Sequence, residues 1–240
     1  MGDDHTDNEN HSQHDRFRVM EHDTAIRAAG IHARYGHRPV LTGIDLRVSW
    51  GTVTVITGPN GAGKSTLLEI LAGVRAPHAG TVRRAGPVAL VVQRPLAPPG
   101  LPLTVGDAVA IGAARPGRRA TRSAAPGWAP APRRRRRDIA GAVAGALAAV
   151  DLAGFAARDF AGLSGGQRQR VLIAQGLATG APILLLDEPA AGLDAASRAR
   201  TRDILAAAAH RGVAVCCVSH DPEDIAAADR NIPLDAVATA

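Results

Sequence analysis

Short apolar runs alternate along the chain with longer stretches in which apolar residues recur at helical spacing. The runs VTVIT at 53–57 and ILLLD at 183–187 have the length and composition of buried strands. From residue 163 onward the pattern predicts a helix, the strand at 183–187, a helix at 197–210 and a strand at 213–219. Because strands that alternate with helices usually form parallel sheets, this order predicts an α/β fold.

The rest of the chain adds further elements and a tail. KSTLLEILAGV at 64–74 and the alanine-rich stretch IAGAVAGALAAV at 139–150 predict helices, and TVRRAGPVALVVQ at 81–93 predicts strand. Residues 1–24 are polar, acidic and histidine-bearing, which is typical of a disordered tail. We therefore expect the ordered chain to begin near residue 25.

Composition narrows the class of protein. Hydrophobic residues make up 46% of the 240 residues and aromatic residues only 2%, so the core must consist of Ala, Val, Leu and Ile. No apolar run approaches the roughly 18 residues that a membrane-spanning helix needs. The polar N-terminus is the opposite of a signal peptide. We therefore expect a cytosolic protein.

The net charge of +6 is unevenly distributed. Residues 115–137 contain nine arginines, including the run Arg133–Arg137. Such a run can bind nucleic acid or anionic lipid. The Pro and Gly residues around it favour a solvated insertion instead.

The two cysteines, Cys216 and Cys217, are neighbours on the predicted strand at 213–219. Successive side chains of a strand point to opposite faces, so this pair does not suit a metal site or a redox motif. We expect two buried free thiols.

The segment GPNGAGKST at 58–66 carries the clearest chemistry. It matches the phosphate-loop pattern G-x-x-x-x-G-K-[ST], with a predicted strand before it and a predicted helix after it. Glycines let the backbone N–H groups of such a loop turn toward phosphates, and the helix N-terminus attracts the same anion. The residues that we expect to bind the nucleotide are Gly58, Pro59, Asn60, Gly61, Ala62, Gly63, Lys64, Ser65 and Thr66.

Lys64 is the only lysine among 28 basic residues, the other 27 being arginine. Lysine is a compact charge on a thin stem that can reach the β- and γ-phosphates, whereas a planar guanidinium needs more width. Ser65 would supply a hydroxyl ligand for Mg²⁺. The alternative, a glycine-rich turn with a chance lysine, does not account for nine matching residues in this context.

The apolar strand ILLLD is followed by a second carboxylate. Asp187 at the carboxyl end of a buried strand matches the Mg²⁺-holding Asp of phosphate-loop ATPases. Glu188 is placed to accept a proton from an attacking water. These residues predict an ATPase with ATP and Mg²⁺ as cofactors.

LSGGQ at 163–167 resembles the signature motif of the ABC (ATP-binding cassette) ATPases. Ser164 has the chemistry of a helix N-cap, Gly165 and Gly166 expose backbone N–H groups, and a helix runs from about Gln167, which makes a second anion site. The resemblance covers about residues 26–235. It implies a head-to-tail homodimer in the ATP-bound state, in which each ATP lies between the phosphate loop of one chain and the signature of the other.

Four further residues match motifs of this family, in the expected order. Gln93 matches the Q-loop glutamine, which contacts Mg²⁺ and water, and Asp194 in AGLD matches the D-loop. His220 in VSHD matches the switch histidine at the γ-phosphate, and Tyr35, the only tyrosine, matches the aromatic residue that stacks on adenine. The resemblance therefore implies that Glu188, His220 and Gln93 are the catalytic residues.

The resemblance also implies the architecture and the partners. The P-loop NTPase core, with its parallel sheet and a small antiparallel β region, would comprise residues 25–92 and 163–240, and 93–162 would form an inserted helical subdomain. The insertion at 115–137 matches nothing in the family pattern. The chain would be cytoplasmic and peripheral on the inner face of the plasma membrane. Its partners would be integral-membrane permease subunits and, indirectly, an extracytoplasmic substrate-binding protein, with no nucleic acid.

The segment PLTV at 102–105, after Gln93, is similar to the ATPase subunits of zinc and manganese importers. We therefore expect zinc as the cargo, with manganese next. Importers of iron chelates and of cobalamin have a related segment and stay an alternative.

Three other classes stay open. A soluble ABC ATPase that acts on nucleic acid or ribosomes would suit the basic run, although such proteins usually carry two cassettes or long coiled coils. An exporter subunit would have the same ATPase chemistry. An ATP-binding module without catalysis is disfavoured because Glu188 and His220 are both present.

Overall fold

The computed structural model describes residues 23–92, 102–114 and 136–235. Three segments for which we drew expectations from the sequence lie largely or wholly outside these ranges. The acidic tail, Gln93 and nearly all of the arginine-rich insertion lie outside the described residues. The division into a core and a helical subdomain stays a prediction.

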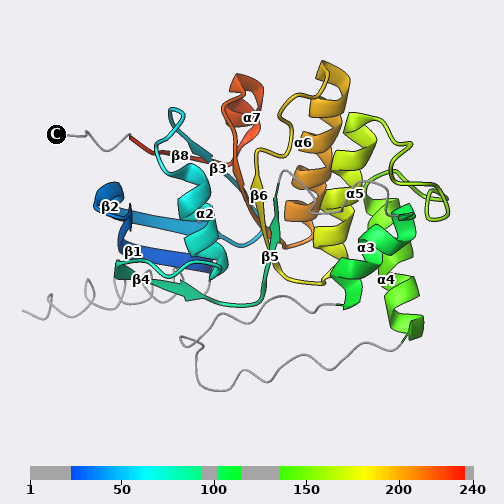
Figure 1. The fold of residues 1–240 in the computed structure, drawn as a ribbon, viewed down its shortest axis with the longest axis horizontal. Coiled ribbons are helices and arrows are strands. Elements are labelled where there is room, and N and C mark those ends of the chain that lie inside the picture. The colour runs from blue at the N-terminus through cyan, green and yellow to red at the C-terminus, as the bar shows by residue number, and fades with distance from the viewer. Residues whose placement is uncertain (1–22, 93–101, 115–135, 236–240) are drawn as a thin grey trace, which may run out of the picture.

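A parallel sheet of five strands forms the centre of the molecule (Figure 1). Its strand order is β5-β6-β7-β3-β8, and every neighbouring pair is parallel. The carboxyl ends of the strands therefore lie at one edge of the sheet, where loops can gather functional residues. The strands are β3 (Val53–Thr57), β5 (Val88–Val91), β6 (Ile183–Asp187), β7 (Ala214–Val218) and β8 (Arg230–Pro233).

A second sheet has three antiparallel strands in the order β2-β1-β4. They are β1 (Thr24–Tyr35), β2 (Arg38–Ser49) and β4 (Ala79–Arg84). The two sheets together confirm the predicted fold class, a mixed α/β fold with a parallel sheet and a small antiparallel sheet.

The single stretch of strand predicted at 81–93 is divided between the two sheets. Its first part belongs to β4 and its second part to β5, with Gly86 and Pro87 between them. Proline lacks the N–H that a strand ladder needs, so the strand ends here. A Cβ at Gly86 would lie 3.0 Å from Pro182 Cγ, so the chain passes closely under the turn before β6.

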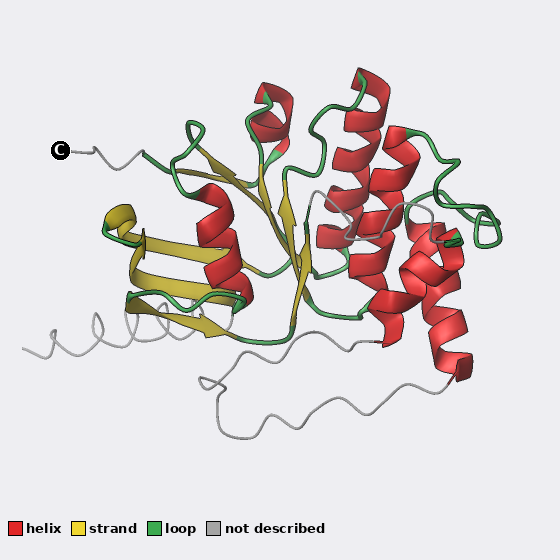
Figure 2. Ribbon diagram, in the orientation of Figure 1, coloured by secondary structure: helices red, strands yellow, loops and turns green. Residues whose placement is uncertain are grey.

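The helices lie on both faces of the parallel sheet (Figure 2). One helix, α2, lies between the two sheets, and α3, α4, α5 and α6 gather on the opposite side. No helix among the described residues is both long and apolar enough to cross a membrane. The helices are α2 (Lys64–Ala72), α3 (Val105–Ala114), α4 (Arg136–Ala149), α5 (Gly165–Ala178), α6 (Ala195–His210) and α7 (Pro222–Ala227).

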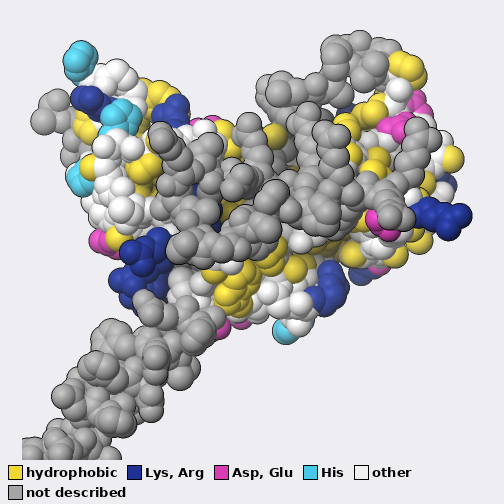
Figure 3. Space-filling view, turned by 90° about the horizontal axis from the view of Figure 1, so that it is seen from below, with side chains coloured by type: hydrophobic (Ala, Val, Ile, Leu, Met, Phe, Trp, Pro, Cys, Tyr) yellow, Lys and Arg dark blue, Asp and Glu magenta, His cyan; other side chains and the backbone are white. Residues whose placement is uncertain are grey.

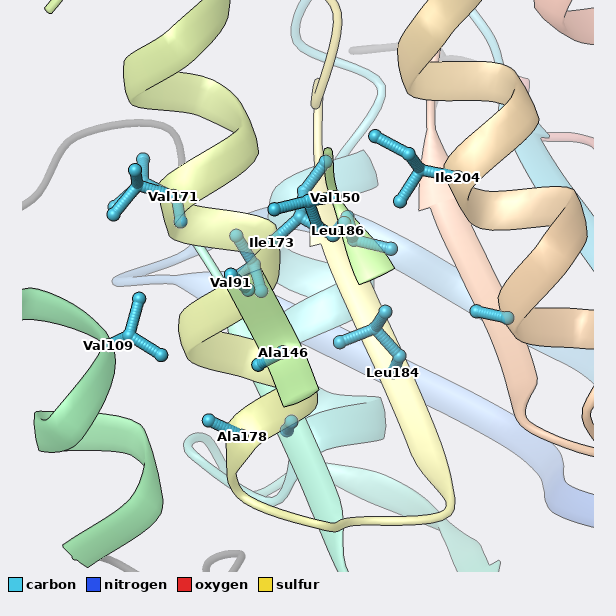
Figure 4. Packing of buried hydrophobic residues seen from close by; sticks show 14 of the residues in the cluster. Val91, Val109, Ala146, Val150, Val171, Ile173, Ala178, Leu184, Leu186 and Ile204 are labelled. Carbon is cyan, nitrogen blue, oxygen red and sulfur yellow. The ribbon is translucent and has the colours of Figure 1, made fainter. Parts of the chain in front are cut away.

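Two apolar clusters occupy the two faces of the parallel sheet. Alternate strand residues such as Leu184 and Leu186 pack against α3 to α6 (Figure 4), whereas Ile183 and Leu185 pack toward α2 and the antiparallel sheet. Burial on both faces explains why β6 is apolar from Ile183 to Leu186.

Cys216 and Cys217 are divided between these two clusters in the same way. Cys216 packs on the α2 side and Cys217 on the α5 side, and both are buried free thiols. The prediction of opposite faces is confirmed.

Candidate functional site

The segment 58–66 connects the end of β3 to the start of α2. Gly58, Gly61 and Gly63 have φ values of 144°, 83° and 92°, a region that side chains with a Cβ avoid. A Cβ at Gly58 would also collide with the backbone carbonyl oxygen of Leu234, and one at Gly63 would lie 2.8 Å from Val40 Cγ1. Backbone conformation therefore favours glycine at all three positions, and at Gly58 and Gly63 the neighbouring chain also leaves no room for a Cβ.

Lys64 curls back over this loop and is only 7% exposed. Its Nζ donates hydrogen bonds to the carbonyl oxygens of Gly58 at 2.8 Å and of Pro59 at 2.9 Å. The amine is thus held inside the curve of the loop, beside the free N–H groups at the start of α2. This position concentrates positive charge where a phosphate chain can enter.

A depression of about 440 Å³ opens over this loop. It contains the predicted residues Tyr35, Asn60, Gly61, Gly63, Lys64, Ser65, Thr66 and Glu188. The sequence analysis missed Arg38, Pro39 and Val40, which also line it. Their signal in the sequence is their place close after Tyr35, at the start of β2, beyond the two-residue turn that joins β1 to β2.

The carboxyl ends of β6 and β7 bring Asp187, Glu188 and His220 to the same edge of the sheet. Asp187 pairs with Val218, and the backbone N–H of Glu188 donates to Val218 O at 3.2 Å. His220 Nδ1 lies 3.8 Å from Glu188 Oε1. The sheet thus joins a carboxylate and an imidazole that are far apart in the sequence.

Glu188 has a φ of 47°, in the left-handed region. This conformation costs a non-glycine residue about 1–2 kcal/mol. Side chains held in such backbone conformations cluster at functional sites. The side chain of Glu188 is 27% exposed and lines the depression.

A polar network fixes the backbone on both sides of His220. Ser219 Oγ donates to the buried carboxylate of Asp224 at 2.6 Å and accepts from the N–H of Asp221 at 3.1 Å. Arg202 pairs with Asp224 at 3.2 Å. Ser219 and Asp221, the neighbours of His220, are therefore held by hydrogen bonds, while the His220 side chain is 68% exposed. The imidazole can thus rotate while the backbone that carries it stays fixed.

The signature segment starts α5 with a reciprocal cap. The backbone N–H of Gln167 donates to Ser164 Oγ at 3.3 Å, and Ser164 N–H donates to Gln167 Oε1 at 3.0 Å. Gly165 and Gly166 form the first turn between them. This cap confirms Ser164 as the N-cap and shows that Gln167 completes it.

Asp194 is the N-cap of α6. Its carboxylate accepts from the backbone N–H of Ser197 at 2.8 Å and from Ser197 Oγ at 3.0 Å. These hydrogen bonds, the backbone one first, hold the pKa of Asp194 below its usual value. None of the signature residues, nor Asp194, lines the depression within the part of the chain that is described. The phosphate loop and the signature segment therefore do not share one pocket within the described chain.

The oxygen ligands that Mg²⁺ prefers are available at this edge of the sheet. Ser65 is exposed in the first turn of α2, and Asp187 ends β6, two strands away from β3 in the sheet order. A hydroxyl and a carboxylate are a suitable donor set for a Mg²⁺ ion that keeps several waters.

Comparison with known proteins agrees with this arrangement. A family model described as "ABC transporter" matches residues 41–191. The chain is 42% identical over 205 residues to the hemin import ATP-binding protein HmuV of Streptomyces coelicolor, covering 81% of this chain and 68% of the relative. It is 36% identical over 214 residues to the aliphatic sulfonates import ATP-binding protein SsuB 1 of Nocardia farcinica, covering 88% and 78%.

A solved structure shares the fold. The bacterial ABC transporter cassette MJ0796, described as dimeric, superposes with a TM-score of 0.69 at 25% identity. The match covers 88% of this chain and 94% of that one.

Proposed function

This chain belongs to the ABC transporter family, whose ATP-binding subunits are ATPases coupled to transport, and we propose that it energises an importer through a separate permease. The observation that carries the proposal is the depression that joins the phosphate loop to Glu188, with the signature segment outside it. Both curated relatives reported above are named as import proteins. The permease would be integral to the membrane, with an extracytoplasmic substrate-binding protein supplying it.

Residues of the depression and of the adjoining carboxyl ends of β6 and β7 have separate roles in hydrolysis. The N–H groups of the phosphate loop and the Lys64 amine bind the triphosphate, and Ser65 and Asp187 would hold Mg²⁺, which offsets phosphate charge. Glu188 accepts the proton of the attacking water, and His220, 3.8 Å from it, orients the reacting groups. Gln93, outside the described residues, is proposed as a further ligand of water and Mg²⁺.

The site is complete only with a second copy of the chain. Ser164, Gly165 and Gly166 present the N-terminus of α5, an anion-binding feature that the local pocket does not use. In a head-to-tail dimer this N-terminus would cover the γ-phosphate held by the partner. The dimeric cassette with TM-score 0.69 supports this assembly.

The proposed cargo differs from the one first expected. The sequence segment after Gln93 indicated zinc or manganese, but neither relative reported above is named for these metals. The chain is 42% identical to a hemin import protein, which supports the alternative of an iron chelate. We therefore propose an iron chelate of the haem class as cargo, in place of zinc.

One variant tests the ATPase mechanism. Glu188→Gln keeps the size of the side chain and removes the base, so hydrolysis should fall by about 10²–10⁴ while ATP still binds. Since hydrolysis reopens the dimer, the variant should elute as a dimer with MgATP and as a monomer with ADP. Adding Ser164→Arg, which places bulk and charge against the partner's nucleotide, should abolish the dimer. A monomeric Glu188→Gln variant at saturating ATP would contradict the composite site.

The cargo is tested in cells that carry the Glu188→Gln allele in place of the native gene. Uptake of iron supplied as haem should fall, and uptake of zinc should match that of the parent. Loss of zinc uptake with normal haem uptake would contradict the proposed haem cargo and support zinc instead.

A further inference from the structure

Tyr35 is held by two residues, one in the first turn of α2 and one in the segment that follows this helix. Its hydroxyl lies 3.2 Å from Thr66 Oγ1, in the first turn of α2. The guanidinium carbon of Arg75 lies 4.1 Å from the centre of the Tyr35 ring. One end of the side chain is therefore hydrogen-bonded and one face of the ring is covered by a cation.

Arg75 is itself fixed by Glu69. Its Nε lies 3.4 Å from Glu69 Oε2, and its backbone N–H donates to Glu69 O at 3.3 Å, where the chain leaves α2 at Gly73. The side chains of Glu69 and Arg75 are 41% and 30% exposed, so this pair is partly screened from solvent. The series Glu69, Arg75, Tyr35 and Thr66 connects the end of α2 to its start through the aromatic ring.

We propose that Arg75 is a positioning residue that fixes the Tyr35 ring for base stacking, an inference that rests on the proposed nucleotide site. Tyr35 is 51% exposed at the edge of the depression, so its ring needs a partner to hold one orientation. With Arg75 on one face, a purine base stacks on the other. A guanidinium over an aromatic face is attracted by the ring quadrupole.

Arg75 acts through the ring and not on the nucleotide itself. It does not line the depression, whereas Tyr35 and Thr66 do. Its loss should therefore weaken binding of the base and leave binding of the phosphates unchanged. A general disturbance of the loop would weaken both.

The test compares ATP with inorganic tripolyphosphate, which lacks the base. Arg75→Met should raise the Kd for ATP roughly two- to fivefold, the range of an exposed cation–π contact, and leave the Kd for tripolyphosphate unchanged. The kcat at saturating ATP should be unchanged, and Arg75→Lys should restore part of the affinity. A matched control is Arg158→Met, which removes a second such pair among the described residues, Arg158 over Phe155 at 3.8 Å, neither of which lines the depression.

A second readout follows the ring directly. The chain has one tyrosine, so incorporation of 3-fluorotyrosine gives a single ¹⁹F signal. Arg75→Met should shift this signal in the free protein and reduce the further shift on ATP addition, and Arg158→Met should do neither. In a Tyr35→Ala background, Arg75→Met should cause no additional loss of ATP affinity.

The outcomes distinguish a failure of the proposed role of Arg75 from a failure of the proposed ATPase function. If the native chain bound no ATP, the proposed function would fail. If it bound ATP but Arg75→Met left both the ATP affinity and the ¹⁹F signal unchanged, only the role of Arg75 would fail. Equal loss of ATP and tripolyphosphate binding would make Arg75 merely structural and would also overturn the inference.

Discussion

Gly166 of the signature turn packs directly against Ser197 of α6. A Cβ placed on Gly166 would lie 2.5 Å from Ser197 Oγ and 2.9 Å from Ser197 Cβ. Ser197 in turn donates to Asp194, so the starts of α5 and α6 are joined through one glycine and one serine. The absence of a side chain at Gly166, a buried residue in the first turn of α5, thus has a packing reason.

Gly166→Ala should therefore destabilise the fold. Overpacking of this kind costs about 1–3 kcal/mol, which for a chain of this size lowers Tm by roughly 2–12 °C. Gly165→Ala is the matched control, because its Cβ would lie 3.8 Å from Leu193 Cδ2, an ordinary contact. Ser197→Gly should restore part of the lost Tm in the Gly166→Ala background. Equal thermal midpoints for the two alanine variants would contradict the packing argument.

Lys64→Arg should abolish most ATPase activity although it keeps the charge. Lys64 is 7% exposed and its amine donates to two loop carbonyl oxygens, so a planar guanidinium has no room in the loop. Steady-state phosphate release measures the effect, with Lys64→Ala as the variant that removes the charge altogether. If Lys64→Arg turned over ATP at a near-native rate, the steric reason for the single lysine would be wrong.

The buried thiols should make stability fall at high pH. Burial first, and then the charge of Asp224, raises the pKa of Cys217 to about 12, and burial raises the pKa of Cys216 also. In the unfolded chain both thiols ionise near their ordinary pKa of about 8.5. The unfolded state therefore binds fewer protons above that pH, and stability decreases as pH rises toward 12.

Urea unfolding between about pH 8 and 10.5 measures this slope. Each thiol contributes at most about 1.4 kcal/mol per pH unit. A Cys216→Ala, Cys217→Ala chain should be less stable at pH 8 but should lose less stability as pH rises. Parallel slopes for the two proteins would rule out the thiols as the cause.

Three arginines lie side by side across the antiparallel sheet. Arg27 of β1 pairs with Arg47 of β2 and with Arg83 of β4, and all three side chains are exposed. Figure 3 shows Lys and Arg side chains gathered on the side of the molecule where this sheet lies. Among the described residues, none of the three forms an ion pair. Like charges directly opposite each other destabilise a sheet.

Arg27→Thr should therefore stabilise the chain at low ionic strength. The gain should be about 0.2–1 kcal/mol, the size of one cross-strand pair, because the central charge is repelled by both neighbours. Added salt at about 1 M shortens the Debye length to about 3 Å, so the difference from the native chain should shrink. Urea unfolding at low and high salt measures both values. A difference that did not depend on salt would point to strand propensity instead of charge.

The sequence by itself determined the fold class, the phosphate loop and the cap of the signature helix. The loop and the cap depend on neighbours in the chain: the glycines at 58, 61 and 63, which have positive φ, and the N-cap Ser164 are local features and so are predicted from spacing. The end of α2 is local in the same way: the helix in KSTLLEILAGV is expected to end at Gly73, and α2 does end at Ala72, with Gly73 in the left-handed conformation as its C-cap.

Only the tertiary structure decided which distant residues meet. Three examples are the division of 81–93 between two sheets, the contact of Gly166 with Ser197 and the position of Arg75 over the Tyr35 ring. Each depends on segments that the sequence pattern does not relate to one another. The physical reason is that strand order and helix packing bring together side chains many residues apart, and a periodic pattern records only that a residue is buried, not what it is buried against. The edge where Glu188 meets His220 exists because β6 and β7 are parallel neighbours in the sheet.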